Sequence, residues 1–382
     1  MQILDATHKF SAQVSWLAGI DFVNRLAYYP ETMTEKPESS KQAPPAARIL
    51  YERILGDIPL RLIHAVTVLN IADFVAAGEH SVDALADRAK VNADILYRVM
   101  RTLSGIEIFT ETGERHFALT PQAELLRTGV PGSLRNFVLY LGADWHYRTW
   151  DHFLETLRCG ETSFDLAYGE PFFEHLQTNS ERAANYNEVM TDHSTMNARQ
   201  VAQSYDFSQF STLMDVGGGH GLLLAEILKA TPELQGIVFD MPGVSLESGN
   251  QFEKAGLSER ASIIEGSFFE ALPRDADGII MKSIIHDWND EKSRQILENC
   301  RDAVGLGGKV LLCEFVLPES NKPGFANLLD LEMLVISGGQ ERSEREFRSL
   351  FDSAGLRLSG IYHTRSGQSI LEAEVSRQSD QP

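Results

Sequence analysis

Apolar side chains within the first 29 residues recur at the spacing of an amphipathic helix. Two adjacent faces of that helix would carry them: Phe10, Val14 and Leu17 on one, and Trp16, Ile20 and Val23 on the other. Residues 30–45 are rich in Pro, Ser, Glu and Lys, and bury too little apolar surface to offset the entropy cost of ordering. We therefore predict an N-terminal helix and a flexible linker over residues 1–45. The helix would cover either the chain's own core or a partner subunit.

Residues 46–126 keep a helical spacing, with turn signals at Gly56, Gly78 and Gly105. Within them, residues 81–103 predict two short helices joined by a tight turn, and residues 106–119 predict a hairpin that turns at positions 112–113. This order is typical of a winged helix, so residues 46–130 are assigned to one domain. This pattern contains four basic and five acidic residues. The basic ones are Arg88, Lys90, Arg98 and Arg101, and the acidic ones are Asp83, Asp87, Asp94, Glu107 and Glu111. Without a basic face, a scaffold or dimerisation role is favoured over DNA recognition.

Residues 131–209 are again helical in spacing and rich in aromatic side chains: Trp145, Trp150, Phe153, Phe164, Phe172 and Phe173. Most of these rings are expected in the core, and a few could line a pocket for a flat ligand. We assign this region to a helical linker that contributes to a substrate pocket.

After Phe210, short apolar runs alternate with helical segments. The runs cover residues 212–216, 236–239, 262–265, 278–281 and 309–315, and helical spacing covers residues 221–231 and 291–303. Strand and helix in alternation predict an α/β fold, with a parallel sheet joined by right-handed crossovers. Residues 210–375 are the candidate catalytic region.

Composition narrows the class of protein. The chain has 382 residues, enough for two or three domains, and 34 basic against 54 acidic residues give a net charge of −20. Because this charge repels phosphate, we expect no nucleic-acid and no membrane partner. Three cysteines without CxxC spacing predict neither a disulfide framework nor a zinc site, and a reducing cytoplasm fits best. No apolar stretch is long enough to span a membrane, and the start lacks the pattern of a signal peptide.

A glycine-rich turn is the first candidate for chemistry. Residues 215–221 read DVGGGHG, and glycines at a strand end before a helix let the backbone approach a ligand closely. The spacing is GxGxG and Leu222 fills the place of a third dinucleotide glycine, which disfavours nicotinamide and flavin. Asp240 follows Gly217 by 23 positions at the end of an apolar run. Its carboxylate could bind ribose hydroxyls or close a turn before Met241, and the ligand role is favoured.

The chain resembles S-adenosylmethionine (SAM) dependent O-methyltransferases of the plant phenolic and bacterial natural-product type. The resemblance covers residues 46–374 and rests on these stretches: DVGGGHG (215–221), VFDMP (238–242), HDWNDE (286–291), GGKVLLCEFVLP (307–318), GGQERSEREF (338–347) and YNEVMTDHS (186–194). It implies a mainly helical, winged-helix dimerisation domain at residues 46–130, a Rossmann-like SAM-binding domain at residues 210–382, and a homodimer.

The resemblance also implies which residues bind SAM. Gly217 and Gly219 would contact the cofactor, and Asp240 would hold its ribose. Further contacts would come from Met241 and Phe268 beside the adenine, Lys282 near the base, and Ser194 at the methionyl carboxylate. Where the family usually has an aspartate in a GDxF pattern, this chain has Ser267 in GSFF, and a hydroxyl is a weaker, neutral partner for adenine.

His286 would be the general base of such an enzyme. It follows the strand predicted over residues 278–285, and an imidazole with a pKa near ~6.5 can accept the proton of a phenol, whose pKa is near ~10. The resemblance places Glu314 and Glu341 beside the ring, where one carboxylate would fix its tautomer. Asp287 would orient the acceptor, a small aromatic or enolic compound, and Trp150 and Met190 would form apolar walls.

No metal is expected, because the methyl group on sulfonium is already activated and the histidines show no HxH or HExxH spacing. The products would be the methyl ether and S-adenosylhomocysteine. Two alternatives stay open. A divergent member of the family would methylate nitrogen or carbon, or use SAM in hydroxylation or decarboxylation. A SAM-sensing regulator would use its winged helix to read DNA, which the acidic balance disfavours.

Overall fold

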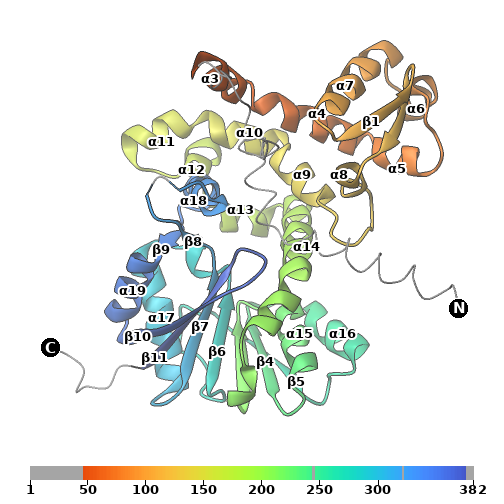
Figure 1. Cartoon of the computed structure of the whole chain (residues 1–382). Coiled ribbons are helices and arrows are strands. Elements are labelled where there is room, and N and C mark those ends of the chain that lie inside the picture. The colour runs from red at the N-terminus through yellow and green to blue at the C-terminus, as the bar shows by residue number, and fades with distance from the viewer. Residues whose placement is uncertain (1–45, 243–245, 321, 376–382) are drawn as a thin grey trace, which may run out of the picture. The chain divides into compact units, whose positions relative to one another are not determined.

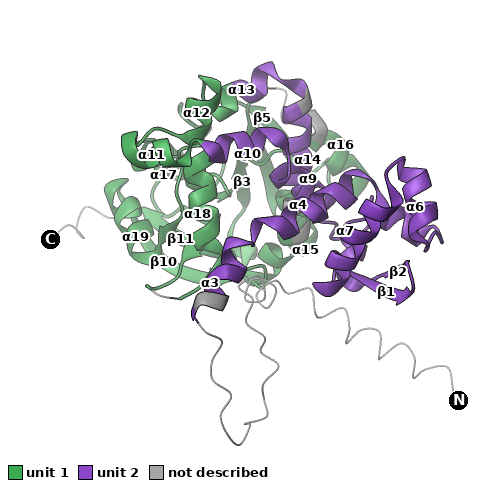
Figure 2. Ribbon diagram, turned by 90° about the horizontal axis from the view of Figure 1, so that it is seen from above, with its two compact units in different colours: residues 1–31, 152–174, 193–382 green, residues 32–151, 175–192 purple. Residues whose placement is uncertain are grey.

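The computed structural model describes residues 46–242, 246–320 and 322–375, for a few of them the backbone only (Figure 1). The helix and linker predicted over residues 1–45 lie outside this part. The described residues form two compact units, the larger from residues 152–174 and 193–375 and the smaller from residues 46–151 and 175–192 (Figure 2).

The smaller unit is mainly helical. Its helices are α3 (Ala46–Ile54), α4 (Asp57–Val68), α5 (Ile71–Ala76), α6 (Val82–Ala89), α7 (Ala93–Gly105), α8 (Pro121–Glu124), α9 (Arg135–Leu141) and α10 (Asp144–Asp151). Ser81 caps α6 by accepting a hydrogen bond from the amide of Ala84, and Asn92 caps α7 by accepting one from Ile95. Such caps satisfy amides that have no partner within the helix. The predicted pair of short helices is therefore present.

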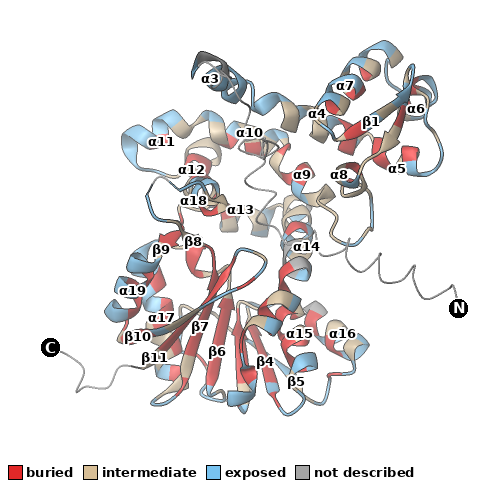
Figure 3. Cartoon of the chain, viewed as in Figure 1, coloured by how far each residue is buried: buried red, intermediate tan, exposed pale blue. Residues whose placement is uncertain are grey.

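An antiparallel hairpin follows α7, formed by β1 (Phe109–Gly113) and β2 (His116–Leu119). The turn predicted at positions 112–113 lies about two residues later in the chain, so that prediction is wrong. Gly113 still pairs with His116, so the turn falls on Glu114 and Arg115, where Arg115 adopts a left-handed φ of 56°. Phe109 and Phe117 from the two strands are buried in the core of the unit with Met100 of α7. Figure 3 colours each element of the chain by how far its residues are buried.

Helices continue through residues 152–204, as predicted. They are α11 (Phe153–Cys159), α12 (Ser163–Tyr168), α13 (Phe172–Thr178) and α14 (Ser180–Ser204). The chain passes from one unit to the other within α13 and again within α14. Phe164 and Phe172 are buried and meet edge to face, with ring centroids 5.2 Å apart, so these two aromatic residues belong to the core.

The larger unit is built on a seven-stranded sheet in the order β10-β11-β7-β6-β3-β4-β5. Its strands are β3 (Thr212–Val216), β4 (Gln235–Asp240), β5 (Ala261–Glu265), β6 (Gly278–Lys282), β7 (Lys309–Glu314), β10 (Leu356–His363) and β11 (Ser369–Val375). The first five are parallel, and β11 runs antiparallel to β7 and to β10. The predicted α/β class is confirmed, but the sheet is mixed rather than all parallel.

Helices cover both faces of this sheet (Figure 1). Besides α14, they are α15 (Leu222–Ala230), α16 (Leu246–Ala255), α17 (Asp290–Val304) and α19 (Glu344–Ser353). A short parallel pair, β8 (Val316–Leu317) and β9 (Arg342–Ser343), lies apart from the sheet, and the helix α18 (Phe325–Ile336) packs against α12 and β8 instead. Alternate strand residues serve opposite faces: Met214 packs in the cluster that contains α17 and α19, and Leu213 packs in the one that contains α14 and α15.

None of the helices in the described ranges is both long and apolar enough to cross a lipid bilayer.

Candidate active site

The glycine turn joins β3 to α15, and backbone geometry explains its composition. Gly217, Gly219 and Gly221 adopt φ values of 72°, 55° and 72°, which side chains disfavour. A Cβ on Gly217 would lie 2.5 Å from Cδ1 of Ile284, whereas a Cβ on Gly219 would meet no protein atom within 4 Å. The first glycine is therefore required for packing, and the second leaves open space above the turn.

Asp240 ties this turn to the carboxyl end of β4. Its Oδ2 accepts a hydrogen bond from the amide of Gly219 at 2.8 Å, and its Oδ1 accepts one from the amide of Met241 at 2.7 Å. Burial raises the pKa of Asp240, and the amide of Gly219 opposes that rise. This arrangement could hold a nucleoside. The carboxylate oxygens of Asp240 have lone pairs left to accept hydrogen bonds from ribose hydroxyls, and no side chain fills the space at Gly219.

Three further residues that the sequence analysis assigned to the adenine have different surroundings. Met241 is 48% exposed. Phe268 lies near the glycine turn, with its ring 3.9 Å from the position of a Cβ on Gly217, and its centroid is 4.9 Å from that of Phe269. The hydroxyl of Ser267 accepts a hydrogen bond from the amide of Phe269, so it closes a local turn. The adenine contact of Ser267 stays a prediction.

Lys282, the last residue of β6, and Asp215, in β3, lie close enough for each to affect the pKa of the other. Burial raises the pKa of Asp215 to about 7, and the charge of Lys282 opposes that shift. Burial lowers the pKa of Lys282, and the charges of Asp215 and Glu314 oppose that decrease. The side chain of Ser194 lies outside the described part of the structure. Trp150 and Met190 belong to the smaller unit, and their role as walls of an acceptor site stays a prediction.

His286 sits in a short 3-10 turn, η3 (Ile285–Asp287), and not at the end of a long strand. The predicted strand over residues 278–285 is too long, because β6 ends at Lys282 and Ser283 turns the chain with a φ of 55°. Glu314, the last residue of β7, then holds the turn. Its Oε1 accepts hydrogen bonds from the amides of Ile284 at 3.1 Å and Ile285 at 2.9 Å.

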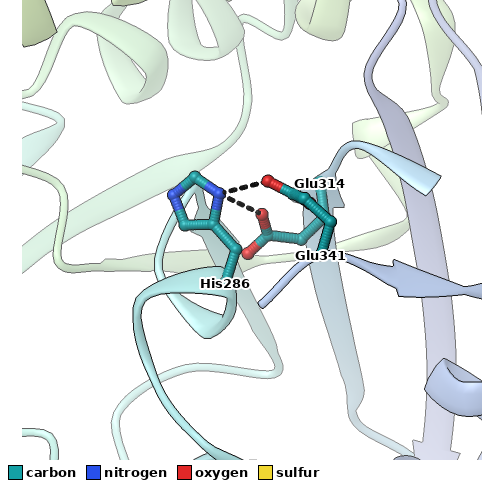
Figure 4. Close-up of side chains that lie close together, drawn as sticks. All are labelled: His286, Glu314 and Glu341. Carbon is teal, nitrogen blue, oxygen red and sulfur yellow. Dashed lines mark hydrogen bonds and ion pairs between the residues drawn. The ribbon is translucent and has the colours of Figure 1, made fainter. Parts of the chain in front are cut away.

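The structure brings His286, Glu314 and Glu341 together (Figure 4). Nδ1 of His286 lies 2.7 Å from Oε1 of Glu341 and 3.8 Å from Oε2 of Glu314. Both glutamates are buried, and the side chain of His286 is 11% exposed. Nε2 points away from the two glutamates, and the nearest carboxylate oxygen that pairs with it, Oδ1 of Asp287, is 3.9 Å away.

Charge around the imidazole makes it more basic than an isolated histidine. Burial lowers the pKa of His286, but the carboxylates of Glu314, Asp287 and Glu341 outweigh burial and raise it to about 10. Burial raises the pKa of Glu314 to about 7 and that of Asp287 to about 6, and the charge of His286 opposes both shifts. The ordinary value of ~6.5 assumed from the sequence therefore does not hold in this site.

Two residues of the GGQERSEREF stretch contribute to the site although they were not among the predicted site residues. A Cβ on Gly339 would overlap the carbonyl oxygen of His286, so only glycine allows the two segments to approach. Arg342 is buried and donates hydrogen bonds to carbonyl groups on both sides of His286. The only sequence signal for them was their place in this motif.

The same three side chains could also ligate a metal ion. One ligand atom from each of His286, Glu314 and Glu341 lies within 4.8 Å of the others. Nδ1 is already bonded to Glu341, which is the arrangement that orients a proton-accepting ring.

Comparison with known proteins assigns the chain to a family. Residues 150–357 match the O-methyltransferase domain. The chain belongs to the O-methyltransferase family. In this O-methyltransferase, residues 60–129 match the O-methyltransferase dimerisation domain.

Individual relatives agree with this assignment. Phenazine O-methyltransferase PhzM of Lysobacter antibioticus is 39% identical over 341 residues, which make up 89% of this chain and 99% of that relative. A crystal structure of LaPhzM is similar with a TM-score of 0.81 and covers 87% of this chain and 100% of the other, at 39% identity. NcsB1, an O-methyltransferase from neocarzinostatin biosynthesis in complex with SAM and 2-hydroxy-5-methyl naphthoic acid, has a TM-score of 0.71 at 32% identity, covering 83% and 95% of the two chains. The protein is a SAM-dependent O-methyltransferase, as predicted, and SAM is its cofactor.

Proposed function

We propose that the enzyme methylates a phenolic or enolic hydroxyl of a small aromatic natural product, with His286 as the general base. The observation that carries this proposal is the 2.7 Å contact between Nδ1 of His286 and Oε1 of Glu341. In the neutral form of the ring, a proton on Nδ1 that is donated to Glu341 leaves the lone pair on Nε2, the nitrogen that points away from the glutamates (Figure 4). Nε2 is therefore the atom that accepts the proton of the acceptor hydroxyl.

The raised basicity of His286 suits this reaction. Once His286 has lost its own proton, an imidazole whose pKa is about 10 can take the proton of a phenol at ~10 at little energy cost, because the two groups hold a proton about equally well. Glu314 and Glu341 stabilise the imidazolium that forms, because both are buried and lie on its Nδ1 side. Asp287 is the polar group that orients the acceptor hydroxyl.

The cofactor residues keep the roles that the resemblance implies. Bound SAM supplies a methyl group that the adjacent sulfonium already activates. Gly217 and Gly219 allow close approach of the backbone, and Asp240 holds the ribose. Around these lie the remaining contacts: Met241, Ser267, Phe268 and Lys282 at the adenine, and Ser194 at the methionyl carboxylate. Trp150 and Met190 confine the acceptor ring, within a pocket region that we assign to residues 131–209.

We also propose that the enzyme is a homodimer. The match of residues 60–129 to a dimerisation domain supports this, and so does a row of exposed apolar side chains on α3. Leu50, Tyr51 and Ile54 are 60%, 64% and 67% exposed. Apolar side chains clustered on one short helix favour burial against a partner.

The proposed activity is tested by transfer of a labelled methyl group from SAM to a panel of phenols, catechols and hydroxyquinones, beside a matched panel of aromatic amines. Methylation confined to the hydroxyl panel supports the proposal. Methylation of amines alone would overturn it in favour of nitrogen transfer. Calorimetry with SAM runs in parallel, so that a failure to bind the cofactor is distinguished from a wrong acceptor.

A further inference from the structure

Arg342 has an unusually complete set of partners for a buried side chain. Its Nη1 donates to the carbonyl of Ile285 at 3.2 Å, and its Nη2 donates to the carbonyl of Trp288 at 2.9 Å. Nε and Nη2 both donate to Oδ1 of Asp290, at 3.0 and 2.8 Å, and Nη2 also reaches the hydroxyl of Ser293 at 3.3 Å. The guanidinium is among the largest fully buried side chains of the described residues.

These bonds connect the two segments that carry the proposed base and its partner. Ile285 precedes His286, Trp288 follows it by two positions, and Arg342 is the residue after Glu341. A backbone bond reinforces the link, since the amide of Gln340 donates to the carbonyl of His286 at 2.8 Å. A shift of the guanidinium would therefore move the η3 turn relative to the carboxylate of Glu341.

We propose that Arg342 is a positioning residue that sets the distance between His286 and Glu341. The inference rests on the proposed function, because it assigns Arg342 an effect only through the base. Lysine cannot replace it, since an ammonium group lacks the planar fork that reaches two carbonyls and a carboxylate at once.

The carbonyl bonds carry this role more than the ion pair does. Asp290 is 72% exposed at its side chain, and solvent screens its charge. Asp290→Asn, which keeps an oxygen in the same place, is therefore expected to change kcat less than twofold.

Arg260 provides a matched control within the larger unit. It also donates to backbone carbonyls, those of Thr231 at 3.0 Å, Pro232 at 2.9 Å and Leu228 at 2.9 Å. It precedes β5, an edge strand that three other strands separate from β7 and Glu314, and its hydrogen bonds lead to this edge and not to the η3 turn. Arg260→Lys removes a comparable set of guanidinium hydrogen bonds, and we expect it to leave the base unaffected.

The experiment compares Arg342→Lys, Arg260→Lys and His286→Gln, singly and in combination. We expect Arg342→Lys to lower kcat by about 10- to 100-fold, the usual effect of a displaced supporting group, with SAM affinity changed less than twofold. In the His286→Gln background, Arg342→Lys should cost almost nothing further, because residues that act as a unit are not additive. The pH profile of kcat should also shift in the single variant Arg342→Lys, and it should stay unchanged in Arg260→Lys.

The outcomes separate the two proposals. If His286→Gln keeps full activity, the proposed base is wrong. Two results with an impaired His286→Gln would show that only the role of Arg342 is wrong. In the first, Arg342→Lys has no larger effect on kcat than Arg260→Lys. In the second, the losses of kcat from Arg342→Lys and His286→Gln multiply in the double variant. Should Arg342→Lys fail to fold, Ser293→Ala is the second variant. The side chain of Ser293 accepts a hydrogen bond from the guanidinium and donates to the carbonyls of Ile285 and Trp288, and Ser293→Ala removes both contacts. We expect its effect to be non-additive with that of His286→Gln in the same way.

Discussion

Nδ1 of His286 lies 2.7 Å from Oε1 of Glu341, and both groups are buried. This contact gives the two nitrogens of the ring different tasks: Nδ1 is fixed by the carboxylate, and Nε2 is available to an acceptor. Glu314 adds a second buried carboxylate on the Nδ1 side, 3.8 Å from the ring. Together they make His286 a strong base at a defined atom.

The raised pKa of His286 predicts an alkaline pH profile. Below pH 10 both His286, with a pKa of about 10, and an ordinary phenol carry their protons, and one proton must leave before the reactive pair forms. The value of kcat/KM for a phenol of pKa ~10 should therefore rise with pH, by up to about tenfold per unit, between pH 7 and 10. Rates measured over this range in buffers of constant ionic strength test it, and a profile that levels off near pH 6.5 would contradict it.

Removing a carboxylate should move that profile. Glu341 raises the pKa of His286, so Glu341→Gln lowers it, and the rise in kcat/KM should end at a lower pH. The maximal rate should also fall, because a neutral amide stabilises the imidazolium less well. Arg260→Lys, distant from the ring, should keep the wild-type profile. An unchanged profile for Glu341→Gln would show that this carboxylate does not control the base.

Gly219→Ala tests the proposed cofactor site. Its Cβ would enter the open space above the turn, so SAM affinity should fall at least about tenfold in calorimetry, while the strain of a left-handed φ costs about 1–2 kcal/mol of folding free energy. Gly256→Ala is the matched control, because Gly256 has a φ of 69° and its Cβ would also meet nothing within 4 Å. We expect both variants to lose a similar amount of folding free energy, and only Gly219→Ala to lose SAM affinity. Normal SAM affinity of Gly219→Ala would place the cofactor elsewhere.

The proposed dimer is tested by charge on α3. Leu50→Glu combined with Ile54→Glu should convert the dimer to a monomer, because burying two carboxylates at an interface is costly. Leu306→Glu is the control, since Leu306 is 85% exposed and lies in the larger unit. Light scattering at micromolar concentration gives the masses. A wild-type monomer, or a dimer that survives the double substitution, would refute this interface.

Chelation is expected to leave turnover unchanged. His286, Glu314 and Glu341 could ligate an ion, but the proposed proton transfer takes place at Nε2 while Nδ1 stays bonded to Glu341, and it needs no metal. Activity is measured after dialysis against EDTA and after re-addition of Mg²⁺ or Zn²⁺. Loss of activity that a metal restores would overturn this part of the mechanism.

Much of the fold follows from local pattern. The strand predicted over residues 212–216 agrees with β3, and the helix predicted over residues 291–303 agrees with α17 within one residue at each end. Periodicity gave less where long-range contacts decide the backbone. The strand predicted over residues 278–285 ends early because Glu314, from another strand, accepts the amide hydrogens of Ile284 and Ile285. The antiparallel strands β10 and β11 likewise depend on pairing with β7 and with each other.

The candidate site was predicted as a set of residues, and its electrostatics were not. His286, Glu314 and Glu341 lie far apart in the sequence, and their resemblance to a family motif brought them together. The pKa of the imidazole depends on how deeply the carboxylates are buried, which spacing along the chain does not reveal. Arg342 was missed because an arginine beside a glutamate in a motif gives no sign that its guanidinium is buried.

The central claim is that His286 removes a proton, and a pair of acceptors tests it most directly. One is a phenol of pKa ~10, and the other is an analogue of similar shape made acidic by ring substituents, with a pKa near ~7. At pH 7, where about 0.1% of the first acceptor and about half of the second are ionised, His286→Gln should lower kcat by about 10²- to 10³-fold for the first and by about tenfold or less for the second. SAM affinity should be unchanged by calorimetry. An equal loss with both acceptors, or no loss with either, would contradict the role of His286 as the general base.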